Sequence, residues 1–141
     1  MSVVTLYHNP KCSTSRNALA LIRHAGIEPE IIEYLKTPPS RATLETLLEQ
    51  AGLSVRDAVR SKEAVFEQLG LDDPNVSDDA IFDAIQQHPV LLNRPFVCSQ
   101  KGARLGRPLE RILDVLPPMP RRAFSRENGT PMLDDHGKLI V

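Results

Sequence analysis

The sequence predicts an α/β fold in which a βαβ half and a ββα half are separated by a helical insert. Three observations support this prediction. The chain opens with a β-rich run, a helical run and a second β-rich run. The stretch at about residues 40–90 has apolar residues at helical spacing, and two short β-rich runs then precede a last helical segment. A length of 141 residues is typical of one domain.

The βαβ half begins with the run "VVTLY", residues 3–7, whose β-rich composition predicts a buried strand. The next residues, "HNPKC", break the strand, and a helical pattern then extends from Ser13 to His24. Gly26 suits the C-cap of that helix. Residues 30–35, "EIIEYL", predict a second strand, and the β-α-β order favours parallel pairing of the two strands through a right-handed crossover.

The insert begins after "KTPPS", where two prolines exclude a regular ladder of hydrogen bonds. Ser40 is a suitable N-cap for a helix over residues 41–51, whose leucines recur at helical spacing. Ser77 is followed by two acidic residues and marks another helix start, because acidic groups complement the positive end of a helix. The remaining helices of the insert are expected at residues 55–60, 62–69 and 78–87.

The ββα half predicts two short strands at residues 95–98 and 103–105, joined by a turn at Lys101 and Gly102. A last helix is expected over residues 108–115, with its proline at the first helical position. The order of these elements around a helical insert is that of the thioredoxin-like fold.

The domain organisation follows from these elements. We expect residues 1–117, with the insert at about 40–90, to form one domain. Residues 118–141 form a C-terminal extension that packs on the same domain. The extension is proline-rich at its start and then polar, with turns expected at Gly129 and Gly137.

Composition excludes several classes of function. A net charge of -1 provides no bulk attraction to nucleic acid or to an acidic membrane. No apolar run is long enough to span a membrane, and the first residues lack the features of a secretion signal. Two cysteines make no disulfide framework, so we expect a cytoplasmic protein with reduced thiols. Without heptads or an apolar stripe, a monomer is the default expectation.

Cys12 lies in "HNPKCSTSR", at or just before the start of the first helix. Unpaired backbone N–H groups and partial positive charge gather there, and both favour a thiolate over a thiol. The same N–H groups form a natural anion site. Nearby cationic side chains add positive potential, and small hydroxyl residues add donors with little bulk. The cationic residues are His8, Lys11 and Arg16, and the hydroxyl residues are Ser13, Thr14 and Ser15.

Other chemistries of a cysteine at this position can be tested against the sequence. A buried structural cysteine is the alternative to a reactive one, although Cys12 lies among polar and cationic residues. A C-x-x-C redox pair would need a second cysteine where Ser15 stands, and a C-x5-R phosphatase loop would need an arginine where Ala18 stands. Zinc would need four ligands at characteristic spacing, and the histidines are scattered, so no metal site is expected.

Three arginines stand out by their setting. Arg94 and Arg107 each precede a proline at an element boundary, which holds their backbone extended, and Arg60 ends a short helix of the insert. Guanidinium groups match tetrahedral oxyanions well. Any single arginine is more often a solvated surface charge, and the spacing does not show that these three converge. From the sequence pattern alone, Pro95 can follow either a cis or a trans bond.

Together these residues resemble the glutaredoxin-coupled, glutathione-dependent arsenate reductases. The resemblance is carried by "YHNPKCSTSRN", "EYLKTPP", "SVRDAVR", "QHPVLLNRPFV", "RLGRPLERILDVLP" and "AFSRENGTPMLDDHGK", which together span nearly the whole chain. It implies a thioredoxin-like fold with a helical insert. It also implies that arsenate is reduced to arsenite, with glutathione as co-substrate, glutaredoxin as partner and no tightly bound cofactor.

The resemblance also implies roles for individual residues. Cys12 would be the nucleophile, and His8 would lower the pKa of Cys12. The oxyanion would be bound by Arg60, Arg94 and Arg107, with help from the helix-start residues Ser13, Thr14 and Ser15. Pro95 would be the cis-proline of thioredoxin-like folds.

Some alternatives stay open. Ser13 stands where members of this family commonly have glycine. Cys98 is either a small strand residue or an intramolecular resolving thiol. A glutathione-dependent thiol transferase or a thioredoxin-like regulatory protein, neither acting on arsenate, are the rival functions. The regulators typically carry the C-x-x-C pair that this chain lacks.

Overall fold

The computed structural model describes residues 3–140, which fall into two compact units. One unit runs through the N-terminal part of the chain to Ile32 and resumes at Arg94, and the other is Glu33–Asn93. We refer to them as the sheet unit and the helical unit. Strand, helix and strand come first along the chain, helices follow, and two strands with a helical segment come last. This is the α/β, thioredoxin-like order with a helical insert that the sequence predicts.

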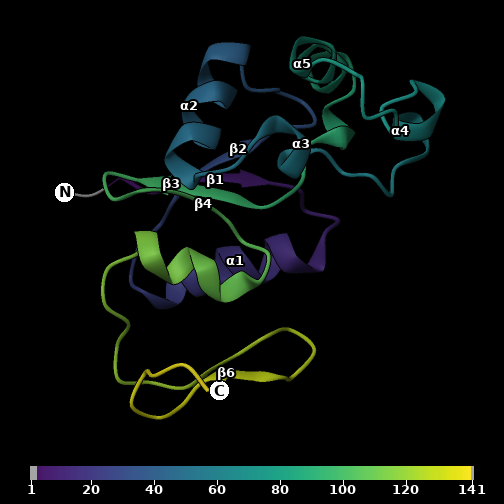
Figure 1. Ribbon diagram of the computed structural model, residues 1–141. Coiled ribbons are helices and arrows are strands. Elements are labelled where there is room, and N and C mark those ends of the chain that lie inside the picture. Colours follow the sequence, from purple (N-terminus) through teal and green to yellow (C-terminus); the bar gives the residue numbers. More distant parts are fainter. Residues whose placement is uncertain (1–2, 141) are drawn as a thin grey trace. The chain divides into compact units, whose positions relative to one another are not determined.

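The sheet unit is built on four strands in the order β2-β1-β3-β4. Strand β3 is antiparallel to both of its neighbours, with Leu6 opposite Val97 and Val97 opposite Arg104. The helix α1 and the 3₁₀ helix η2 lie side by side on one face of this sheet (Figure 1). The elements of this unit are β1 (Thr5–His8), α1 (Ser13–His24), β2 (Glu30–Glu33), β3 (Phe96–Ser99), β4 (Gly102–Leu105), η2 (Leu109–Val115), β5 (Phe124–Ser125) and β6 (Pro131–Leu133).

One apolar core joins these elements. Leu6 of β1, Ile22 of α1 and Ile112 of η2 are fully buried in it. The C-terminal hairpin β5-β6 contributes Phe124 and Leu133 to the same core. Each fully buried side chain of this size contributes about 1.5–3 kcal/mol. Burial of this apolar surface therefore holds the C-terminal segment against the sheet unit.

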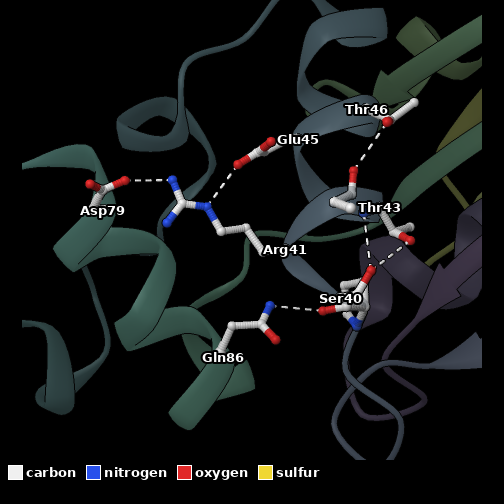
Figure 2. Close-up of polar contacts among 9 residues, drawn as sticks. Ser40, Arg41, Thr43, Glu45, Thr46, Asp79 and Gln86 are labelled. Carbon is white, nitrogen blue, oxygen red and sulfur yellow. Dashed lines mark hydrogen bonds and ion pairs between the residues drawn. The ribbon is translucent and has the colours of Figure 1, made fainter.

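In the helical unit, polar contacts cap the helix that begins at Arg41 and connect it to the helix that begins at Asp78 (Figure 2). The Ser40 side chain caps α2 by accepting a hydrogen bond from the Thr43 backbone N–H, at 3.1 Å. Arg41 pairs with Glu45 one turn along α2 and with Asp79 at the start of α5. The elements of this unit are α2 (Arg41–Ala51), α3 (Val55–Ala58), α4 (Ala64–Gln68), α5 (Asp78–Gln87) and η1 (Pro89–Leu91).

The last helical segment differs from the prediction. Residues 108–115 were expected as an α-helix that starts at its proline, but η2 is a 3₁₀ helix, and Pro108 precedes it in an extended conformation. The buried residues Leu109, Ile112 and Val115 recur every third position. A 3₁₀ helix has three residues per turn, so it places all three on one face toward the core.

Several other bounds differ from the sequence prediction by a few residues, among them the helix expected at 62–69, which is Ala64–Gln68, and two of them have a clear structural reason. The helix expected at 55–60 ends at Ala58, because Val59 takes an extended conformation and pairs with Leu92 in a β-bridge. The strand expected at 30–35 ends at Glu33, where the Lys36 backbone N–H closes a turn onto the Glu33 carbonyl. Long-range pairing thus ends the helix, and formation of a turn ends the strand.

Candidate active site

Cys12 is the N-cap residue of α1. Its backbone N–H donates to the Asn9 carbonyl at 3.0 Å, and its own carbonyl accepts from the Arg16 N–H at 3.0 Å. These two bonds close the loop between β1 and α1 and place the cysteine where the helix begins. The sulfur is therefore next to the first-turn N–H groups, which have no partner within the helix.

The surroundings of the sulfur lower the pKa of Cys12 below the ordinary value of a thiol. Partial burial acts in the opposite direction, because it disfavours the charged thiolate. Burial is outweighed by the backbone N–H groups of Ser15 and Thr14 and by the Arg94 guanidinium, which all interact with the sulfur. The start of α1 and a buried cation thus favour the thiolate together.

Two of the three predicted arginines are next to this sulfur. Arg94 is 9% exposed and interacts with the sulfur directly. Nη2 of Arg107 lies 3.7 Å from the Cys12 Sγ, while Nε of Arg107 donates to the Arg94 carbonyl at 2.7 Å. The bond between Arg94 and Pro95 is cis, the geometry that the resemblance implies. The bond between Arg107 and Pro108 is also cis, which no feature of the sequence indicated.

The third arginine belongs to the helical unit. Nε of Arg60 forms an ion pair with Glu63 at 3.1 Å, and both side chains are about three-quarters buried, with exposed fractions of 24% and 27%. The structure thus brings Arg94 and Arg107 to the sulfur, and a role for Arg60 in oxyanion binding stays a prediction.

His8 is buried at the end of β1 and contacts the start of α1. Its Nδ1 lies 2.6 Å from the Ser15 hydroxyl, which also accepts a hydrogen bond from the Asn9 backbone N–H at 3.0 Å. Ser15 itself is fully buried. The Ser15 hydroxyl therefore ties the β1–α1 loop to the helix that bears Cys12, and an effect of His8 on the pKa of Cys12 stays a prediction.

Arg16 was expected to add positive potential near the sulfur, and it does interact electrostatically with Cys12, although its main partner is Glu127 of the C-terminal segment. Its guanidinium donates to both carboxylate oxygens of Glu127, at 2.9 and 2.7 Å, and to the Pro10 carbonyl at 2.8 Å. The Asn17 side-chain oxygen accepts from the Glu127 backbone N–H at 2.9 Å. Sequence reasoning missed these partners, and the only signal for them was the motif "AFSRENGTPMLDDHGK".

Cys98 is half-buried on β3, and its surroundings differ from those of Cys12. Burial raises the pKa of the Cys98 thiol, and its interactions with Thr5 lower it only in part. The pKa of Cys12 is therefore lowered while that of Cys98 is raised, and this difference makes Cys12 the better nucleophile near neutral pH.

Two features are absent from residues 3–140. No group of three histidine, cysteine, aspartate or glutamate residues in this part of the chain is arranged to hold a metal ion. No helix in the same range is both long and apolar enough to cross a membrane.

Comparison with known proteins identifies close relatives. The sequence model of the ArsC family matches residues 7–115. An arsenate reductase of Rhizobium meliloti is 56% identical over 138 residues, which cover 98% of this chain and 99% of that protein. An arsenate reductase of Escherichia coli is 48% identical over 140 residues, 99% of each chain. The structure of the arsenate reductase from Vibrio cholerae is 48% identical, with a TM-score of 0.78, and the match covers 81% of this chain and 98% of that one.

Proposed function

The chain belongs to the ArsC family, and on that premise we propose that it reduces arsenate to arsenite with glutathione and glutaredoxin as reductants. Relatives named arsenate reductase match it over nearly their full length, at 48% and 56% identity. This family is the one that the sequence motifs indicate. The choice of reductant is part of the proposal, and it is supported by the absence of a second cysteine at position 15, where a C-x-x-C pair would have one.

The observation that carries the proposal is the setting of the Cys12 sulfur. The lowered pKa of Cys12 favours the thiolate form, and the guanidinium groups of Arg94 and Arg107 lie against the sulfur. A nucleophile that attacks a dianionic oxyanion must overcome the repulsion between two negative groups. Two cations next to the attacking atom reduce that repulsion and also bind the oxygens of the substrate.

We propose that the reaction proceeds in three steps. The Cys12 thiolate first attacks arsenic, a sulfur–arsenic bond forms, and one arsenate hydroxyl takes up a proton from the solvent and leaves as water. A glutathione thiolate then attacks the Cys12 sulfur. The sulfur–arsenic bond breaks and its electron pair stays on arsenic, which is reduced from the pentavalent to the trivalent state and leaves as arsenite. A glutaredoxin thiolate finally attacks the glutathione sulfur of the mixed disulfide and regenerates the Cys12 thiolate.

The other predicted residues have supporting roles in this proposal. The first-turn residues Ser13, Thr14 and Ser15 offer N–H groups to the oxyanion, and Arg60 is a third cation for it. His8 is a positioning residue in this proposal, because its Nδ1 contacts the Ser15 hydroxyl in the first turn of the helix that bears Cys12. We place the protein in the cytoplasm, where glutathione keeps thiols reduced.

A coupled assay tests the proposal. Arsenate-dependent consumption of NADPH is measured with glutathione, glutaredoxin and glutathione reductase present. Wild type should turn over, and Cys12→Ser should not, because a serine hydroxyl is not deprotonated near neutral pH. Arsenate reduction by the Cys12→Ser variant would refute the nucleophile. No arsenate-dependent signal from wild type, together with activity on a glutathione mixed disulfide, would favour the thiol transferase.

A further inference from the structure

A pocket of about 340 Å³ lies within the sheet unit, and one of its lining residues is Arg107, whose Nη2 is 3.7 Å from the Cys12 Sγ. Its polar lining comes from the first turns of α1, the loop before η2, and the turn of the C-terminal hairpin. The residues are Ser13, Thr14, Asn17, Arg107, Arg126 and Asn128. Pockets for small ligands start at about 300 Å³, so this one is larger than a tetrahedral oxyanion needs and suits a small polar molecule.

The charge of the lining selects an anionic ligand. Two of the described residues around the pocket are arginines, and none is acidic. Arg107 forms the end next to the sulfur. Arg126 has an ion pair with Glu110, and its 3.6 Å separation is longer than a hydrogen bond. Its planar fork matches a carboxylate, so a ligand can extend from the sulfur to a carboxylate at Arg126.

The hairpin turn that carries Arg126 is anchored on α1. Glu127, the next residue, binds Arg16 through both carboxylate oxygens and Asn17 through its backbone N–H. The Asn17 oxygen is occupied by this bond, so Asn17 can offer its amide NH₂ to a ligand. The C-terminal segment is thereby a wall of the pocket as well as part of the core.

We propose that this pocket binds glutathione during the reduction step. Glutathione is a tripeptide with two carboxylates, one ammonium group and a central thiol. One of its carboxylates pairs with Arg126, and its thiol points past Arg107 to the Cys12 sulfur. The ligand identity rests on the proposed function, because that function requires a small thiol reductant next to the arsenylated cysteine.

The pocket geometry serves the step already described. The glutathione sulfur must approach Cys12 opposite to the breaking sulfur–arsenic bond, so the two sulfurs join while the electron pair goes to arsenic. The guanidinium of Arg107 stabilises the incoming thiolate at the same end of the pocket. The thiol proton of glutathione is taken up by the departing arsenite, so no further oxidant or reductant enters this step.

Direct binding tests the proposal without relying on turnover. S-methylglutathione cannot form a disulfide and is titrated into the full-length protein by calorimetry. Arg126→Gln should weaken its binding about tenfold, because one charge-assisted pair is lost. Arg126→Lys keeps the charge without the fork and should bind with intermediate affinity. The matched control is Arg121→Gln, an exposed arginine of the same segment that does not line the pocket, and it should bind like wild type.

Kinetics separate this proposal from the function on which it rests. Arg126→Gln should raise KM for glutathione about tenfold and leave KM for arsenate unchanged. An equal rise in both KM values would assign the pocket to the oxyanion and overturn the proposal. Equal S-methylglutathione affinity in Arg126→Gln and wild type, or no binding to wild type, would also overturn it. Binding that needs Arg126, without arsenate-dependent turnover, would keep the pocket and refute the arsenate function.

Discussion

Arg107→Gln should raise the pKa of Cys12, because it removes a positive charge that lies 3.7 Å from the sulfur. Two unit charges about 4 Å apart interact by about 1 kcal/mol in water and about 4 kcal/mol near a protein surface. Arg107 is exposed, so the lower part of this range applies, at about 1–2 kcal/mol. Losing that energy disfavours the thiolate, so the pKa of Cys12 should move up toward the ordinary value of a thiol.

The pKa of Cys12 is read from the pH dependence of thiolate absorbance and of alkylation by iodoacetamide. Cys98→Ala provides the background, so that one thiol titrates. Arg107→Lys keeps the charge and should retain most of the lowered pKa. Arg111→Gln removes an exposed arginine of η2 and should leave the pKa as in wild type. If Arg107→Gln titrates like Arg111→Gln, the guanidinium does not stabilise the thiolate and the electrostatic reasoning is wrong.

Three further predictions concern packing, capping and the second cysteine. Gly106→Ala should destabilise the protein by about 1–3 kcal/mol in urea unfolding, because the new methyl group would lie 3.0 Å from the Pro95 Cγ. Ser40→Ala should reduce the free energy of unfolding by about 1 kcal/mol, because the Thr43 N–H loses its acceptor. Cys98→Ala should keep full glutaredoxin-dependent turnover in the coupled assay, since the raised pKa of Cys98 makes it a poor nucleophile.

The controls and contrary outcomes of these predictions are specific. Thr46→Ala, in the middle of α2, removes a hydroxyl that donates only to the Ala42 carbonyl, and it should leave the unfolding midpoint nearly unchanged (Figure 2). Equal effects of Ser40→Ala and Thr46→Ala would contradict the capping argument. A wild-type midpoint for Gly106→Ala would mean that the loop yields without strain. Lost turnover in Cys98→Ala would revive the resolving-thiol alternative.

Some features of the candidate site could be predicted from neighbouring residues in the sequence, and others depend on contacts between distant residues. The stretch "HNPKCSTSR" contains a histidine, a cysteine before a helix start and small hydroxyl residues. Because these residues are neighbours in the chain, their chemistry could be predicted from the sequence. The meeting of Arg94 and Arg107 at the sulfur could be expected only from a family resemblance, because their spacing does not encode convergence. The contacts of Glu127 with Arg16 and Asn17 join residues more than a hundred positions apart, and no local pattern announces them.

By itself the sequence determined the elements whose signals are local. The helices α1, α2 and α5 have the expected bounds, because apolar periodicity and, for α2 and α5, the N-caps Ser40 and Ser77 act within a few residues. Tertiary structure decided what depends on distant partners. The bridge from Val59 to Leu92 ends α3, the core selects a 3₁₀ geometry for η2, and the hairpin completes a pocket that Arg107 also lines. Burial and pairing energies arise only when the chain brings these segments together, so no local pattern could contain them.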